Sequence, residues 1–144
     1  MRVLLQRVSQ AKVEVDHQVI GSIEQGLLLF LGIHAQDDFS SVEYLVDKIV
    51  NLRIFSDREG KMNLSLLDVG GAVLLVSQFT LYGDCQTGRR PSFIQSAKAS
   101  LAEPLYESFI QELKKKCSVE TGKFGANMQV SLVNDGPVTL FLEK

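Results

Sequence analysis

The sequence predicts an α+β fold with a mainly antiparallel sheet and two main helices. Short runs in which apolar and polar residues alternate occur near both ends of the chain, and two continuous apolar runs lie between them. Only two segments repeat their apolar residues with a helical period. Roughly seven or eight strands are therefore expected beside two helices, a ratio typical of antiparallel α+β domains.

The composition indicates one globular domain that spans residues 1–144. Hydrophobic residues make up 45% of the chain and charged residues 22%, which is enough apolar surface for a sizeable core. The formal net charge of −2 gives no general basic surface, so a nucleic acid would have to be bound locally. The apolar amino terminus is interrupted by Gln6 and Arg7, and it predicts neither a signal peptide nor a membrane span. We therefore expect no membrane partner. Because Cys85 and Cys117 are isolated, we expect a cytoplasmic protein with free thiols.

The first third of the chain predicts a β meander. Apolar and polar residues alternate around Val3 and again around Val13, and a turn at residues 16–17 precedes a further alternating stretch. Residues 26–33, GLLLFLGI, form a continuous apolar run without a helical period. Its length suits a strand that is buried on both faces.

The first helix is expected to begin at Ser40. Ser40 and Glu43 have the spacing of a capping box, in which the hydroxyl and the carboxylate each bind a free backbone N–H. One helical face then collects the apolar residues Val42, Leu45, Val46, Ile49 and Leu52. The polar residues 56–63, with Gly60 at their turn, predict a loop.

The next two elements are a buried strand and a second helix. Residues 72–81, AVLLVSQFTL, contain the second continuous apolar run. Ser100 and Glu103 predict another capping box, and Pro104 lies close enough to this start to be tolerated. Three lysines, Lys114–Lys116, close the helix at the end where cations suit its dipole.

The chain ends in a predicted hairpin. Residues 128–134 and 138–143 both alternate, and the Asp135-Gly136 pair between them is a strong turn signal. The bond from Gly136 to Pro137 is either cis or trans, and the residues alone favour an ordinary trans turn.

Recognisable catalytic motifs are absent. The sequence has no GxSxG, no HExxH, no GxGxxG and no P-loop. His17 lies in the predicted surface turn, and His34 ends a strand, where a polar residue without a catalytic role is the simpler interpretation. The scattered His and Cys residues lack the ligand spacing of a zinc site, so no metal and no cofactor are expected. Such a chain could still hydrolyse an activated ester, given an oxyanion hole, correct placement and a water.

The segment Ser77-Gln78-Phe79-Thr80 is the first candidate site. Polar side chains follow abruptly on a buried strand, so side-chain and backbone donors meet at its end. These are the components of an oxyanion hole. The alternative is a polar strand end that satisfies its own backbone.

Two motifs carry a resemblance to a known family. SQFTL followed by a carboxy-terminal NDGPVT is similar to the pattern of the D-aminoacyl-tRNA deacylases. The likeness extends along the whole chain through MRVLLQRV, GLLLFLGI, LRIFSDREGKMNLSLLDVGG, VSQFTLYGD, GRRPSF, LYESF and TGKFGANM. Each segment alone is weakly specific, whereas their shared order is highly specific.

The resemblance implies a homodimeric hydrolase with a barrel-like sheet. Its substrate would be the ester between a D-amino acid, or glycine, and the terminal adenosine of tRNA. Gly136 and Pro137 would form a chirality filter that enters the partner subunit's site through a cis bond. Their carbonyls would hold the substrate α-amino group and leave no room for an L side chain.

The resemblance also distributes roles within the pocket. Ser77, Gln78, Phe79 and Thr80 would line the reacting carbonyl, with backbone N–H groups near Phe79 and Thr80 as the oxyanion hole. The ribose 2′-hydroxyl of the substrate would help to activate the water. A nucleophilic Thr80 is the older alternative, and no base for its hydroxyl is evident.

Phe124, Gly125 and Met128 match the part of the family that receives the adenine. An aromatic face, a close-approach glycine and a thioether suit a flat base, although the same residues could form a hydrophobic edge of the core. No role is placed on Asn127.

Basic residues have weaker assignments. Arg7 could support the Gly-Pro segment through hydrogen bonds. Arg89, Arg90 and Lys114–Lys116 could contact tRNA phosphates, but such residues are more often solvated surface.

Two rival functions stay open. One is a small-molecule esterase with Thr80 as nucleophile. The other is a non-catalytic RNA-binding dimer, against which the near-neutral charge argues.

Overall fold

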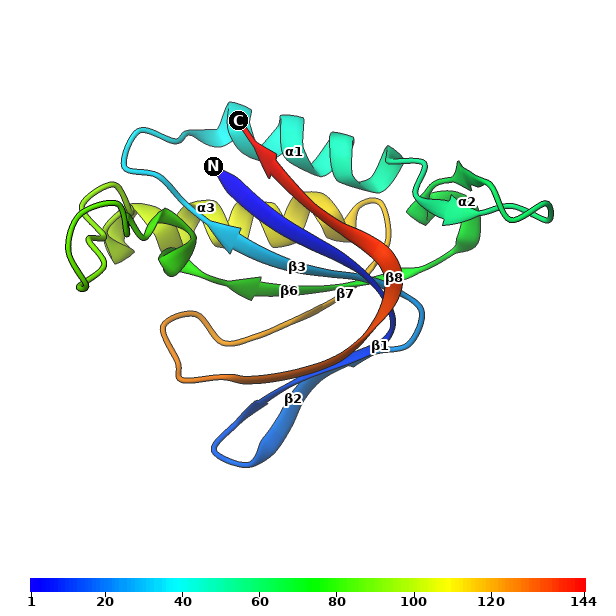
Figure 1. Cartoon of the computed structure of the whole chain (residues 1–144), viewed down its shortest axis with the longest axis horizontal. Coiled ribbons are helices and arrows are strands. Elements are labelled where there is room, and N and C mark those ends of the chain that lie inside the picture. The colour runs from blue at the N-terminus through cyan, green and yellow to red at the C-terminus, as the bar shows by residue number, and fades with distance from the viewer.

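A six-stranded mixed sheet curls into a nearly closed, barrel-like shape in the computed structural model, which describes residues 1–144 (Figure 1). Its strands are β1 (Arg2–Val15), β2 (Gln18–Ile23), β3 (Gly26–Gly32), β6 (Ala72–Ser77), β7 (Ser118–Thr121) and β8 (Gln129–Glu143). A small second sheet joins β4 (Phe55–Ser56) to β5 (Met62–Leu64). The helices are α1 (Phe39–Asn51), α2 (Leu66–Val69), α3 (Ala99–Lys114) and the 3-10 helix η1 (Phe79–Tyr82). The predicted α+β class is confirmed, with a short third α-helix beyond the two expected.

The main sheet is mixed, with three antiparallel strand pairs and two parallel ones, so the expectation of a mainly antiparallel sheet is correct only in part. The strand order is β2-β1-β3-β6-β7, with β8 paired to β1. The pairs β1–β2, β1–β3 and β1–β8 are antiparallel, whereas β3–β6 and β6–β7 are parallel. A parallel pair needs a crossover connection, and the segments that contain α1 and α3 provide these crossovers.

Alternate residues of β3 serve two separate cores. Leu27, Leu29 and Leu31 belong to the larger cluster, which they share with the buried faces of α1 and α3. Leu28 belongs to a smaller cluster on the other side, formed with the curled half of the sheet. Both predicted apolar runs therefore contain strands buried on both faces, as expected. The second strand was expected over residues 72–81 but ends at Ser77, and the chain then forms η1.

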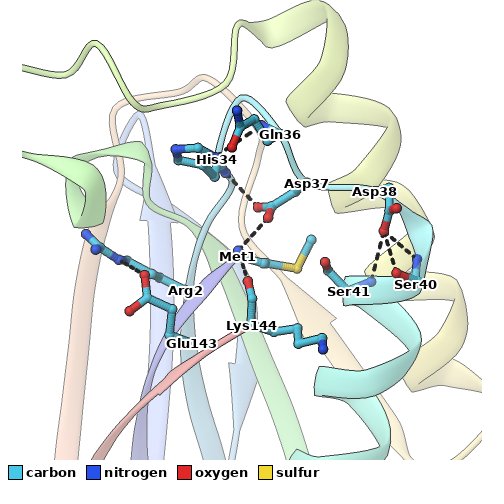
Figure 2. Close-up of polar contacts among 10 residues, drawn as sticks. All are labelled: Met1, Arg2, His34, Gln36, Asp37, Asp38, Ser40, Ser41, Glu143 and Lys144. Carbon is cyan, nitrogen blue, oxygen red and sulfur yellow. Dashed lines mark hydrogen bonds and ion pairs between the residues drawn. The ribbon is translucent and has the colours of Figure 1, made fainter.

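The first helix begins earlier than the capping-box pattern predicts. Asp38 is the N-cap of α1, and its carboxylate accepts hydrogen bonds from the backbone N–H groups of Ser40 and Ser41 (Figure 2). The predicted box of Ser40 and Glu43 is therefore wrong. The capping-box pattern is local, and Asp38, two residues before Ser40, offers a stronger acceptor.

The second predicted capping box is also wrong. The backbone of Lys98 caps α3 without a side-chain bond, so Ser100 and Glu103 lie inside the helix. Pro104 is then an interior residue of α3, not a first-turn one. The true capping box joins Ser65 to Asp68 at the start of α2. No helix is long and apolar enough to cross a lipid bilayer.

The predicted carboxy-terminal hairpin is wrong as well. Residues 129–143 form one strand, β8, that runs along β1 over almost its whole length (Figure 1). Gln6 pairs with Thr139 and Val8 with Asn134, so residues 135–138 leave the ladder opposite Arg7. An Asp-Gly pair predicts a chain reversal locally, but the pairing of both halves with β1 keeps the chain in one direction.

Both chain ends close the sheet beside the loop that follows β3. The α-ammonium nitrogen of Met1 lies 2.6 Å from Asp37 Oδ1 and 2.6 Å from the carbonyl oxygen of Lys144 (Figure 2). The other carboxylate oxygen of Asp37 accepts from the backbone N–H of His34 at 2.7 Å. These bonds fix the loop that leads from the end of β3 to α1.

Candidate active site

A pocket of about 450 Å³ opens at the carboxyl ends of β3 and β6. Its walls come from these two strand ends, from the start of η1, from residues 96–102 and from residues 124–130. The lining residues are Leu31, Ile33, Val76, Ser77, Gln78, Phe79, Ser96, Ala97, Ala99, Ala102, Phe124, Gly125, Ala126, Asn127, Met128 and Val130. None of these side chains is ionisable, so the lining itself supplies no general acid or base.

The pocket unites two predicted groups that lie far apart in the sequence. Six of the nine predicted site residues line it: Ser77, Gln78, Phe79, Phe124, Gly125 and Met128. Thr80 follows on η1, directly next to the wall, and is exposed. Gly136 and Pro137, which belong to β8, do not line the pocket.

The end of β6 presents unoccupied backbone donors. The N–H of Gln78 continues the sheet and donates to the carbonyl of Leu31 at 2.8 Å. The chain then turns into η1, where the N–H groups of Phe79 and Thr80 have no acceptor within the chain. Such free donors are inherent in the first residues of a helix. Two neighbouring N–H groups can together bind a negatively charged oxygen.

The hydroxyl of Thr80 is bound to an amide and not to a base. Gln78 Nε2 donates a hydrogen bond to Thr80 Oγ1. Neither His17 nor His34 lines the pocket. A side-chain amide cannot remove the proton of a hydroxyl, so the geometry does not activate Thr80 as a nucleophile.

An aromatic wall lies opposite the end of β6. Gly125 has a φ of 72°, a left-handed conformation that suits glycine, and it turns the chain after Phe124. The ring of Phe124 packs against Tyr106 with centroids 5.6 Å apart. The hydroxyl of Tyr106 donates to the carbonyl of Leu75 at 3.1 Å. Burial raises the pKa of Tyr106 far above its ordinary value, so this phenol stays neutral and structural.

Phe79 forms the rim of the pocket. Its side chain is 57% exposed and meets Phe93 edge to face, with centroids 5.2 Å apart. Phe93 lies in the loop that also carries Arg89 and Arg90, both of which are exposed.

The Gly136–Pro137 segment lies away from the pocket of its own chain. Its peptide bond is cis, as the resemblance implies, and both residues are exposed. The segment lies opposite Arg7, which pairs with Leu27, whereas Ser77 pairs with Leu31. Leu27 and Leu31 are four residues apart along β3, so the Gly136–Pro137 segment and Ser77 are separated by about 13 Å in the strand direction.

Arg7 holds this segment, as predicted. Its guanidinium donates to the carbonyls of Asp135 at 3.2 Å and Gly136 at 3.3 Å, and it lies 2.8 Å from the Asp135 carboxylate. A third bond goes to the carbonyl of Ile54. Arg7 is only 5% exposed, so these bonds compensate the burial of its charge.

Arg2 is a contact that the sequence did not reveal. Its Nη1 donates to the carbonyl of Leu81 at 3.0 Å, its Nε binds Glu143 at 2.7 Å, and its guanidinium lies over the ring of Tyr82 (Figure 2 shows the Glu143 contact). The end of η1 is thereby tied to β1. Nothing local in the sequence links residue 2 with residue 81, so only the folded sheet shows this contact.

Asn127 and Ser96 add polar groups to the wall. Neither residue was assigned a role in the sequence analysis. Ser96 is brought to the pocket by a bridge to His34, while the side chain of His34 packs on Tyr82 with centroids 5.2 Å apart. His34 therefore lies behind the wall, which agrees with a structural role.

The remaining candidates lie on the surface or are inert. Lys115 and Lys116 form ion pairs with Glu112 and Asp47. Both cysteines are free thiols, and burial raises the pKa of Cys117.

Comparisons with known proteins agree along the whole chain. The pattern of the family described as D-Tyr-tRNA(Tyr) deacylase matches residues 4–143. A protein named D-aminoacyl-tRNA deacylase from Thermosipho africanus is 58% identical over 99% of this chain and 97% of its own length. A protein of the same name from Clostridioides difficile is 56% identical, with the same coverage of both chains.

Two solved structures share the fold. One, named c-Myc DNA Unwinding Element Binding Protein, has a TM-score of 0.94 and 40% identity, and the match covers 100% of this chain and 99% of the other. The second is described as a probable eukaryotic D-amino acid tRNA deacylase. It has a TM-score of 0.84 at 18% identity over 98% of this chain and 97% of its own, so it supports the fold alone.

Proposed function

The chain belongs to the D-Tyr-tRNA(Tyr) deacylase family, and from this premise we propose that it hydrolyses the ester between a D-amino acid and the terminal adenosine of tRNA. The observation that carries the proposal is a pocket without ionisable side chains beside two free backbone N–H groups. An aminoacyl ester is already activated, so an oxyanion hole and a placed water are sufficient for its hydrolysis. An amide would need more than this site provides.

The N–H groups of Phe79 and Thr80 form the proposed oxyanion hole. They would bind the carbonyl oxygen as it gains negative charge, with Ser77 and Gln78 lining the same carbonyl. The lining contains no group that could act as a base. The substrate's own ribose 2′-hydroxyl would therefore help to activate the attacking water. Thr80 then positions the substrate instead of attacking it.

Phe124, Gly125 and Met128 form the proposed adenosine site. An aromatic ring and a polarizable thioether suit the faces of a purine, and a glycine allows close approach. These residues lie on the wall that faces the proposed oxyanion hole, so one pocket would hold both the adenosine and the ester.

Gly136 and Pro137 form the proposed chirality filter, contributed by a second copy of the chain. Within one chain they lie about 13 Å along the sheet from the level of Ser77, so a neighbour is the simpler source. Gly136 is also not required by its own fold. An added Cβ would meet only Asn134 Oδ1, at an ordinary 3.8 Å, and the φ of Gly136 is not left-handed. If glycine is required at position 136, the requirement would come from contacts with the partner subunit's pocket and its substrate.

The second copy would pack on the exposed side of β8. This strand pairs only with β1, so its other edge is free, and Val133, Leu140 and Phe141 are exposed along it. A homodimer would cover this apolar surface. The enzyme would act in the cytoplasm, where tRNA is charged.

A deacylation assay tests the proposed function. The protein should release D-tyrosine from D-Tyr-tRNA and glycine from Gly-tRNA, while L-Tyr-tRNA stays intact. Equal rates on both tyrosine isomers would refute the chirality filter. Binding of tRNA without release of any amino acid would indicate a nucleic-acid-binding protein, and equal activity on free amino-acid esters would favour a small-molecule esterase.

A further inference from the structure

The Gly136–Pro137 segment projects from a wide bulge in β8. Between the pairs Gln6–Thr139 and Val8–Asn134, one residue of β1 stands opposite four residues of β8. At such a bulge the backbone groups at its base lose their ladder partners. The shape of the projecting segment therefore depends on what replaces the missing hydrogen bonds.

The side chain of Asn134 replaces two of them. Its Nδ2 donates to the carbonyl of Arg7 on β1 at 3.0 Å and to the carbonyl of Val138 on β8 at 3.0 Å. An amide NH₂ group has two hydrogens in a fixed plane, so one nitrogen can bind both carbonyls at once. This single planar group therefore links the two ends of the bulge to each other and to β1.

The rest of the segment is held on either side of this amide. Val138 is only 4% exposed and anchors the far end of the bulge in the larger core. Arg7 binds the carbonyls of Asp135 and Gly136 from the other strand. The Oδ1 atom of Asn134 lies 3.8 Å from the position that a Cβ of Gly136 would take, so the same side chain also lies beneath the projecting glycine.

We propose that Asn134 is a positioning residue for stereochemical selection, because its amide fixes how far and in which direction Gly136 and Pro137 project. This inference rests on the proposed function, in which the projecting segment separates D from L substrates. Asn134 touches no reacting atom. It acts through the backbone carbonyls at the base of the bulge.

The test compares the rates on D-Tyr-tRNA and L-Tyr-tRNA for two variants. Asn134→Ala removes the side chain, and Asn134→Leu keeps its approximate size without its donors. The ratio of the D rate to the L rate should fall at least about tenfold in both, since two hydrogen bonds that fix the segment are lost. Thermal unfolding of each variant identifies the one that retains the fold.

Thr139→Val is the matched control. Thr139 Oγ1 accepts a hydrogen bond from Gln6 Nε2 at 3.1 Å, which joins the same two strands just beyond the bulge. This variant should keep the ratio of the wild type.

Two results would overturn the inference. One is a wild-type ratio in folded Asn134 variants, and the other is an equal loss of activity on D-Tyr-tRNA and Gly-tRNA without any gain on L-Tyr-tRNA, which would show a purely structural role. A wild-type protein that itself fails to separate D from L would instead refute the proposed chirality filter. The wild-type ratio thus distinguishes failure of the proposed function from failure of this inference.

Discussion

Phe79 and Thr80 each present a backbone N–H group that no acceptor in the chain occupies. Both groups lie at the start of η1, beside a pocket without ionisable side chains. The chemistry proposed for the site therefore depends on main-chain atoms, which most side-chain substitutions leave in place. Only a residue that removes an N–H tests this role directly.

Phe79→Pro removes one of the two donors. Proline is tolerated at the first position of a helix, and the preceding Gln78, with φ −146° and ψ 78°, lies outside the α region that a following proline disfavours. We expect kcat on D-Tyr-tRNA to fall about 100-fold or more, as for loss of an oxyanion-hole donor elsewhere.

Phe79→Ala is the paired variant. It removes the ring and its contact with Phe93 but keeps the N–H. Its loss of kcat should be much smaller than that of the proline variant. Equal losses in the two variants would assign the effect to the aromatic ring and not to the backbone donor.

A site residue could be predicted from the sequence when the residues that define its position are close to it in the chain. Ser77, Gln78 and Phe79 were found because a polar stretch after a buried strand is visible in the sequence. Ser96 and Asn127 were missed, because their place on the wall depends on how distant segments pack. Arg2 and Leu81 are 79 residues apart in the sequence, so their contact leaves no local signal.

Among the secondary-structure elements, helix starts were the least predictable. The Ser40–Glu43 and Ser100–Glu103 patterns both have capping-box spacing, yet neither caps a helix. The pattern states only that a cap could form. It does not exclude a stronger acceptor upstream, and Asp38 is such an acceptor for α1.

The stability contributed by Asp38 should depend on pH. Hydrogen bonds from the Ser40 hydroxyl and from the N–H groups of Ser41 and Ser40 hold the pKa of Asp38 below its ordinary value of 3.8. A carboxyl whose pKa is lower in the folded state stabilises the fold fully above the unfolded pKa and loses this contribution as the pH falls through the folded pKa.

Asp38→Ala should lower the Tm at neutral pH by a few degrees, through loss of the N-cap. The difference in unfolding free energy between wild type and Asp38→Ala should shrink as the pH falls below 3.8. Asp38→Asn keeps a side-chain acceptor that does not titrate, so its difference from Asp38→Ala should stay constant. Urea unfolding between pH 2.5 and 6 measures both differences, and a wild-type difference that is independent of pH would contradict the assignment.

Strand order was harder to predict than strand content. The number and type of elements followed from periodicity, but the parallel pairs β3–β6 and β6–β7 were not expected. Strands buried on both faces are typical of parallel sheets, and the run of residues 26–33 carried that signal. Likewise, only pairing with β1 shows that β8 does not turn back at Asp135 and Gly136.

At the scale of the whole molecule, the proposed site is complete only when two chains meet. In this proposal one chain provides the pocket beside η1, and the other would provide Gly136 and Pro137 from the exposed bulge of β8. A methyl group at position 136 meets no close contact within its own chain, so Gly136→Ala should keep the Tm of the wild type. In the partner's pocket the same methyl group would displace the substrate and lower activity at least about tenfold.

Co-expression of Phe79→Pro and Gly136→Ala chains at equal levels therefore tests the shared site most directly. If subunits pair at random, half of the dimers are mixed, and each mixed dimer has one site with an intact pocket and an intact Gly-Pro segment. Activity on D-Tyr-tRNA should then recover to about a quarter of the wild-type value, well above either variant alone. Activity no higher than the average of the two separate variants would contradict a site built from two chains.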